Sequence, residues 1–92
     1  MGLNISLYKG YAEHPEWDSA RFAGDRDFAT LMGGLPCEMK RESIDADPVF
    51  RPSDFARWRE AIASREWPNP GRFEHMMDLL ERDADYWIFL GW

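Results

Sequence analysis

Cysteine is nearly absent from this 92-residue chain, which contains Cys37 alone. A single thiol cannot form an intramolecular disulfide, whereas secreted domains of this size usually carry several pairs of cysteines. The chain also has no apolar run near the roughly 18 residues of a membrane span, because the longest, Tyr86–Leu90, is only as long as a strand. The opening MGLNISLYKG lacks the basic start and apolar stretch of a signal peptide. We therefore expect a cytoplasmic protein without a membrane segment.

Basic residues are in the minority, since eleven lysines and arginines face seventeen acidic residues and give a net charge of −6. Proteins that bind nucleic acid usually carry clustered lysine and arginine, so this balance argues against direct contact with DNA or RNA. A negative surface attracts a basic protein partner, although the same charge also serves solubility alone.

The negative charge is concentrated in two segments. Residues 13–27 hold five acidic residues and two arginines, a net −3, and residues 74–85 hold five acidic residues and one arginine, a net −4. If the two segments lie side by side, their field would steer a basic partner toward them. The candidate partner-binding residues are therefore Asp25, Asp27, Glu74, Asp78, Glu81, Asp83 and Asp85. Trp67, in a connector with Pro68 and Pro70, is a candidate exposed anchor, with core filling as the alternative.

Residues for catalysis are few. His14 lies in a polar stretch and is expected to be an exposed loop histidine. His75 and Asp78 are three apart on a predicted helix and could share a metal ion, but two ligands do not hold zinc, so we expect a solvated helix face. Cys37 follows Pro36 and is expected to be a buried or half-buried thiol. Phosphate-loop and nucleophile-elbow patterns are missing, so the sequence predicts no catalytic residue, metal or cofactor.

Hydrophobic periodicity predicts three strands and two or three helices. Leu3, Ile5 and Leu7 alternate with polar residues, which is typical of a half-buried strand. The continuous apolar run Tyr86–Leu90 predicts a central strand covered on both faces and paired with the first strand. Residues 38–44 are expected to form a short middle strand, followed by a turn over 45–48.

The helices are predicted from apolar stripes and end signals. A short helix is expected over 25–32, where Gly33 and Gly34 end it. Residues 53–64 form a second helix with Ser53 as its cap and with Phe55, Trp58 and Ile62 on one face. A third helix is expected with Asn69 as cap and Pro70 at its first position, because Phe73, Met76, Met77 and Leu80 follow helical spacing. The predicted fold is a single α+β domain over residues 1–92, with a small antiparallel or mixed sheet packed by these helices.

Three stretches of the chain carry a family resemblance: MGLNISLY, FRPSDFARWREAI and DLLERDADYWIFLGW. They resemble small uncharacterised accessory proteins of bacteriophages and prophages, and they contain no catalytic motif. The resemblance implies a mobile-element accessory protein. Small acidic phage proteins of this sort often block host machinery, including anti-CRISPR proteins that occlude basic nucleic-acid-binding surfaces.

The sequence therefore predicts a protein that binds stoichiometrically and inhibits or modulates host machinery through an acidic surface. Its partner would be basic, for example a host nucleic-acid-binding protein. Two alternatives remain open. One is a small hydrolase-like enzyme that uses His14 or His75 with carboxylates, and the other is a structural homodimer joined through a sheet edge or the exposed tryptophans.

Overall fold

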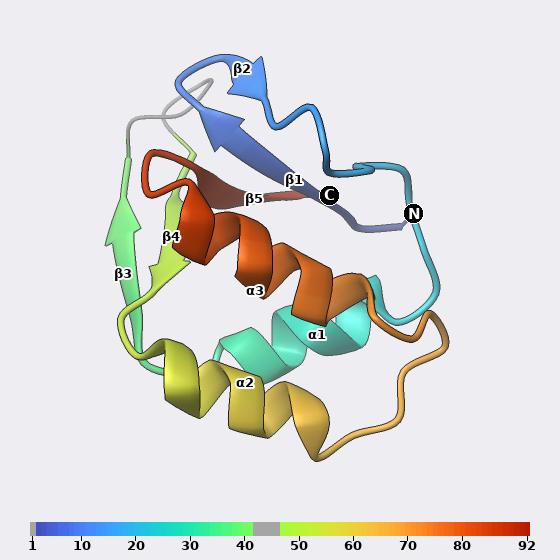
Figure 1. Cartoon of the computed structure of the whole chain (residues 1–92). Coiled ribbons are helices and arrows are strands. Elements are labelled where there is room, and N and C mark those ends of the chain that lie inside the picture. Colours follow the sequence, from blue (N-terminus) through green and yellow to red (C-terminus); the bar gives the residue numbers. More distant parts are fainter. Residues whose placement is uncertain (1, 42–46) are drawn as a thin grey trace.

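The fold is an antiparallel sheet with helices packed against it (Figure 1). The computed structural model describes residues 2–41 and 47–92. Within these ranges five strands follow the order β2-β1-β5-β4-β3, and every pair is antiparallel. The strands are β1 Asn4–Lys9, β2 Ala12–Glu13, β3 Cys37–Lys40, β4 Val49–Pro52 and β5 Trp87–Gly91, and the helices are α1 Asp25–Met32, α2 Phe55–Ala63 and α3 Arg72–Arg82. The predicted α+β fold is confirmed, with more strands than expected.

The first and last strands pair as predicted. Leu7 lies opposite Ile88 and Ile5 opposite Leu90, so the apolar residues of β1 and β5 share the helix-facing side of the sheet. β5 is the central strand, but the expected burial of both its faces is wrong. Ile88 is fully buried, whereas Trp87 and Phe89 are half-buried on the other face. On that face the Tyr8 ring lies 5.6 Å from the Phe89 ring, and no described helix packs over it.

The middle of the chain holds a hairpin rather than one strand. β3 occupies Cys37–Lys40, while positions 42–44 of the predicted strand and 45–46 of the predicted turn lie outside the described residues. β4 was missed because Pro48 precedes it, Pro52 is its last residue and Arg51 interrupts its apolar pattern. The Arg51 guanidinium is nevertheless buried, because it donates to the carbonyls of Tyr86 at 2.7 Å and Leu80 at 2.9 Å.

The predicted helices form, but α2 and α3 begin later than expected. α1 has the predicted bounds. Asp54 rather than Ser53 caps α2, because its Oδ1 accepts the amide of Arg57 at 3.1 Å. The cap of α3 is Gly71, with φ of 85°, so the predicted start at Asn69 and Pro70 is wrong. Only glycine adopts this backbone conformation without strain.

The core lies between the sheet and the three described helices. The predicted stripe on α3 is confirmed, since Phe73, Met76, Met77 and Leu80 are all buried, and Trp58 and Ile62 of α2 are buried as well. The Phe28 ring of α1 stacks on the Phe73 ring with centroids 4.3 Å apart. None of the described helices is long and apolar enough to cross a membrane.

Candidate functional site

The exposed side of α3 carries carboxylates in helical register. Glu74, Asp78 and Glu81 are exposed, while the opposite side of the helix supplies the core residues described above. Arg59 of α2 donates to Asp78 at 2.9 Å and to Glu81 at 2.7 Å, so these two carboxylates also tie α2 to α3. Glu74 makes no such contact with any described residue, and its side chain is exposed to solvent.

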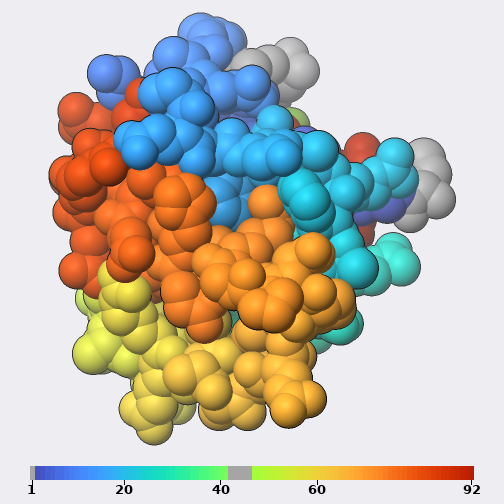
Figure 2. All heavy atoms as spheres, turned by 45° about the vertical axis from the view of Figure 1, so that its right-hand side comes forward, coloured from blue at the N-terminus to red at the C-terminus, as the bar shows by residue number. Residues whose placement is uncertain are grey.

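The segment 13–18 lies directly against α3 (Figure 2). His75 Nε2 donates to the Glu16 carbonyl at 2.9 Å, and the Arg82 guanidinium pairs with both Glu16 and Asp83. His14 Nε2 lies 2.6 Å from Asp83 Oδ2. These contacts bring the first part of one acidic segment beside the other. We call the exposed carboxylates of residues 13–18 and of α3 the acidic surface: Glu13, Glu16, Asp18, Glu74, Asp78 and Glu81.

His14 is buried, which contradicts the expectation of an exposed loop histidine. Only 3% of the residue is exposed, and its ring lies 4.4 Å from the Tyr86 ring. Nδ1 accepts the backbone N–H of Glu16 at 3.1 Å, so the ring proton lies on Nε2, which donates to Asp83. Nδ1 therefore orders the segment 13–18 internally, and Nε2 attaches that segment to Asp83 at the end of α3.

A metal ion does not suit this cluster, although His14, Glu16 and Asp83 offer ligand atoms within 4.8 Å of one another. A metal ligand needs a free lone pair, and Nε2 carries the proton because Nδ1 accepts a hydrogen bond. Moving that proton to Nδ1 would point two N–H groups at each other. The Arg82 guanidinium already occupies an oxygen of each of the two carboxylates. The cluster is a structural clamp between two segments.

The enzyme alternative depends on a histidine and a carboxylate with a shifted pKa in one hollow. A hollow of about 380 Å³ does contain His75 and Glu16. The pKa of Glu16 is lowered, chiefly by the hydrogen bond from Arg82. A carboxylate held ionised by a guanidinium is a weaker base than an ordinary one, whereas a general base works best with a pKa near the operating pH. This geometry gives acid–base catalysis no support.

Asp25 is not available to a partner. It is 1% exposed and forms a bidentate pair with Arg72, from Nε at 2.9 Å and from an Nη at 3.2 Å. Asp25 Oδ2 also accepts the amide of Phe22. The position of Asp25 at a helix start predicted a surface carboxylate, because sequence spacing does not connect it with the distant Arg72.

Trp67 is half-buried and serves the core rather than acting as an exposed anchor. Its indole Nε1 donates to the Ile62 carbonyl at 2.9 Å, and its ring meets the Phe73 ring edge-on at 4.8 Å. Asp27 is exposed on α1, and no hydrogen bond or ion pair in the described chain joins it to the acidic surface. Asp83 is half-buried in the clamp, and Asp85 is exposed just beyond α3.

Cys37 is exposed on β3, so the expectation of a buried or half-buried thiol is wrong. β3 is the last strand of the sheet, and its residues Cys37, Glu38 and Met39 have exposed side chains. An edge strand has a neighbouring strand on one side only, so its side chains are more exposed than those of a central strand. The sequence around Pro36 did not indicate that this strand would lie at an edge.

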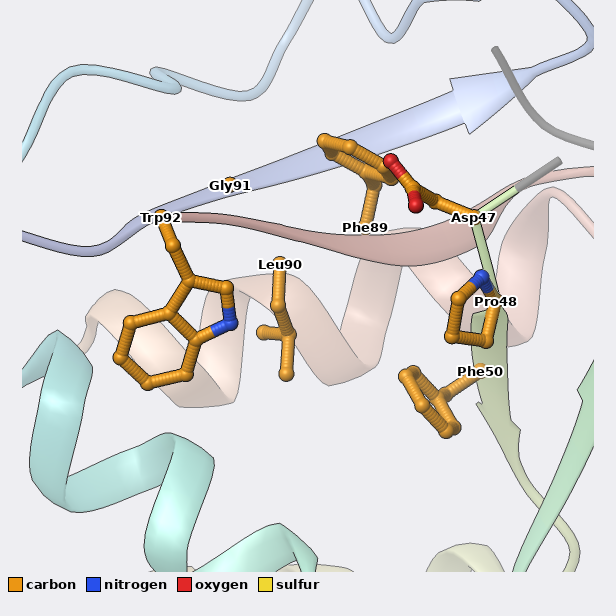
Figure 3. A pocket seen from close by; sticks show the side chains of 7 residues that line it. All are labelled: Asp47, Pro48, Phe50, Phe89, Leu90, Gly91 and Trp92. Atoms are coloured by element: carbon orange, nitrogen blue, oxygen red, sulfur yellow. The ribbon is translucent and has the colours of Figure 1, made fainter. Parts of the chain in front are cut away.

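A second hollow, of about 520 Å³, lies beside the end of β5 (Figure 3). Phe50, Leu90 and Trp92 point to the same side of the strand ribbon and form its apolar lining. Asp47 is the charged group of this lining. With so few polar groups to orient a ligand, this hollow has no chemistry that identifies an occupant.

The clamp predicts a specific dependence of stability on pH. The pKa of Asp83 is lowered from its ordinary 3.8, chiefly by Arg82 and then by His14, and that of Glu16 is lowered from 4.5. Since the folded values lie below the unfolded ones, this stabilisation is present above about pH 4.5 and disappears as the pH falls through the folded values. Urea denaturation of Arg82→Met should show a shallower loss of stability in acid than the unmodified chain.

The matched control for this measurement is Arg57→Met, which removes an exposed arginine whose guanidinium forms no ion pair within the described ranges. Its stability should fall in acid as steeply as that of the unmodified chain. If the free energy of unfolding depended on pH in the same way for all three proteins, Arg82 would not be the group that lowers these pKa values.

Sequence reasoning missed His14, Arg72 and Arg82 as the residues that position the acidic surface. His14 and Asp83 are 69 residues apart, and Arg72 and Asp25 are 47 apart, so no local pattern connects them. The available signal was that each acidic segment holds few basic residues, which makes Arg82 the natural counter-ion of residues 74–85.

Comparison with known proteins gives no relative from which a function can be transferred. No protein-family model, curated protein or solved structure matches the chain. The functional argument therefore depends on the acidic surface and on the clamp that forms it.

Proposed function

We propose that this chain is a binding protein whose acidic surface docks on a basic protein and blocks or modulates it. The observation that supports this proposal is the clamp of His14, Glu16, Arg82 and Asp83, which places residues 13–18 beside the exposed carboxylates of α3. Two negative segments that meet in one region produce a stronger local field than the same charges dispersed over the molecule.

The carboxylates at this surface outnumber the arginines that pair with them. Arg59 pairs with Asp78 and Glu81, and Arg82 pairs with Glu16 and Asp83. Among the described residues, Glu74 has no counter-ion and the carboxylate of Asp18 accepts one backbone amide. Electrostatic complementarity of this kind mainly accelerates association and selects basic partners. It is weakened by salt, because exposed charges are screened within about 10 Å at 0.1 M ionic strength.

The proposed partner is a basic, nucleic-acid-binding protein of a bacterial host, met in the cytoplasm. The charge of −6 supports a basic partner, and the phage resemblance supports a host target. An acidic protein docked on a nucleic-acid-binding surface would compete with nucleic acid for the same lysines and arginines.

Glu74→Lys tests the acidic surface most cleanly, because Glu74 is exposed and holds no other part of the described chain in place. Charge reversal at Asp78 or Glu81 would also release Arg59, so a loss of binding there would have two causes. We expect the immobilised chain to retain basic nucleic-acid-binding proteins from a bacterial lysate, to release them as salt rises, and to retain several-fold less as Glu74→Lys.

The matched control is Glu66→Lys, which makes the same charge change at an exposed position between α2 and α3. It should bind as the unmodified chain does. A captured protein should also lose its affinity for DNA or RNA when the chain is added. The proposal fails if capture is insensitive to salt, or if Glu74→Lys and Glu66→Lys bind equally well.

A further inference from the structure

Within residues 2–41 and 47–92, no strand pairs with the outer backbone edge of β3. β3 is the last strand in the order β2-β1-β5-β4-β3 and lies at the outer margin of the molecule (Figure 1). The opposite edge is formed by β2, which is only two residues long. A free edge of this type can accept another strand through its unused N–H and C=O groups. Met39, which is 54% exposed, lies in the middle of this edge.

The hydrogen-bond pattern determines which backbone groups point outward. The amide of Ser53 donates to the Pro36 carbonyl at 3.2 Å, so Pro36 and Ser53 form a hydrogen-bonded pair. In an antiparallel ladder such pairs recur every second residue, so Glu38 and Lys40 bond toward β4. The N–H and C=O groups of Cys37 and Met39 therefore point away from β4, toward the open edge.

The side chains of β3 separate into two faces. Glu38 lies opposite Arg51 and Lys40 lies opposite Val49, so both are on the sheet face of Trp87 and Phe89. Lys40 Nζ lies 4.5 Å from the centre of the Trp87 ring, which agrees with this placement. Cys37 and Met39 are on the opposite face.

We propose that β3 pairs antiparallel with β3 of a second copy, about a two-fold axis at Met39. In this register Met39 faces Met39 of the second copy through outward-pointing backbone groups. Glu38 then lies directly opposite Lys40 of the second copy, and the symmetry repeats this pair of opposite charges. The edge is thus complementary to itself in both hydrogen bonding and charge.

The other registers allowed by the outward backbone groups are less favourable. A shift that places Cys37 opposite Met39 brings Glu38 against Glu38 of the second copy, and directly opposed like charges destabilise a sheet. A shift that places Cys37 opposite Cys37 brings Glu38 against Pro36 and loses the complementary charge pairs. The charges therefore select the register about Met39.

The dimer formed in this way is closed and weak. Each copy contributes one edge of about one strand, which is smaller than the interface of a stable complex, so the dimer should appear only at high concentration. The isologous pairing uses both copies of β3, and β2 is too short to extend the sheet further. The chain would form dimers rather than filaments.

Charge exchange between Glu38 and Lys40 tests this pairing. Glu38→Lys places lysine opposite Lys40 of the second copy, and Lys40→Glu places glutamate opposite Glu38, so each variant alone should dimerise roughly tenfold more weakly. An equimolar mixture of the two variants should regain the dimer, because opposite charges face each other again at both positions. Sedimentation equilibrium at low salt measures all three constants.

Glu66→Lys provides the control for net charge, and thermal denaturation confirms that each variant is folded. The control should dimerise as the unmodified chain does. The proposal is overturned if the unmodified chain stays monomeric at the highest soluble concentration, if either variant dimerises normally, or if their mixture gains nothing. Its failure would leave the acidic surface untouched, since that surface is tested by Glu74→Lys and does not include β3.

Discussion

Replacing Arg72 with methionine is expected to destabilise the domain by about 3–5 kcal/mol, which is the usual cost of removing one partner from a buried ion pair. The Arg72 side chain is 7% exposed and that of Asp25 is 1% exposed. Methionine keeps much of the side-chain volume but leaves the Asp25 carboxylate buried without its counter-ion. For a domain of this size, total stability is only about 5–15 kcal/mol, so much of it would be lost.

The surroundings of Arg72 explain why the effect should be large. Its guanidinium lies 4.2 Å from the centres of both the Trp17 and Phe22 rings, and it donates to the carbonyl of Asp18 at 3.0 Å. One side chain therefore attaches residues 17–25 to the start of α3. Loss of Arg72 should also loosen the segment that carries part of the acidic surface.

Urea denaturation of Arg72→Met, Asp25→Asn and the double variant measures this effect. The double variant should be less destabilised than the sum of the single variants, because the second substitution removes a group that is already unpaired. Arg59→Met is the matched control: its partners Asp78 and Glu81 are exposed, so it should cost at most about 1 kcal/mol. Equal losses for Arg72→Met and Arg59→Met would contradict the assignment of a buried pair.

Replacing Phe28 with alanine is the second substitution with a large expected effect, about 3–5 kcal/mol. Phe28 is fully buried, stacks on Phe73, and lies 6.1 Å from the Trp58 ring and 6.2 Å from the Trp67 ring. Alanine would leave a cavity among the rings of Trp58 on α2, Phe73 on α3 and Trp67 in the connector between them. The melting temperature should fall by at least about 12 °C, since each kcal/mol corresponds to roughly 4–8 °C in small domains.

Phe28→Leu separates the loss of volume from the loss of the aromatic stack. It retains most of the apolar volume and should be considerably less destabilising than Phe28→Ala. Tyr11→Ala, at a residue that is 78% exposed, should change stability by less than about 0.5 kcal/mol. If Phe28→Ala were as mild as Tyr11→Ala, the aromatic cluster would not be the centre of the core, and Trp67 could again be considered a surface anchor.

Periodic segments were predictable from sequence, and segments stabilised by distant polar contacts were not. The stripe on α3 and the alternation of apolar residues in β1 each repeat with the period of their element, so local spacing was sufficient to place both elements. The expected exposure of the other face of β1 is not found at Ser6, which is buried. β4 contains a buried arginine between prolines, and the carbonyls of Tyr86 and Leu80 stabilise that arrangement. No local pattern could reveal those acceptors.

In the candidate site, too, the features set by local spacing were predictable and those set by distant contacts were not. Exposed carboxylates on α3 followed from helical spacing, whereas the burial of His14 and Asp25 depends on partners far along the chain. A polar residue in a polar stretch is usually exposed, and both residues are exceptions because each is hydrogen-bonded or ion-paired when buried. The sequence therefore predicted the charge of the surface but not the contacts that assemble it.

The two surfaces we propose are independent in location. The acidic surface lies on α3 and residues 13–18, and the dimer edge lies on β3. A dimer would carry two acidic surfaces. It could then bind a target with two basic sites more tightly than a monomer, provided that the spacing of the sites matches.

The rate at which a captured basic protein binds the chain, measured against ionic strength, tests the central claim most directly. The unmodified chain and Glu66→Lys should associate quickly at low salt and slow steeply as salt rises, whereas Glu74→Lys should associate more slowly and depend less on salt. Identical salt dependence for Glu74→Lys and Glu66→Lys would show that the carboxylates gathered on α3 and residues 13–18 do not guide recognition.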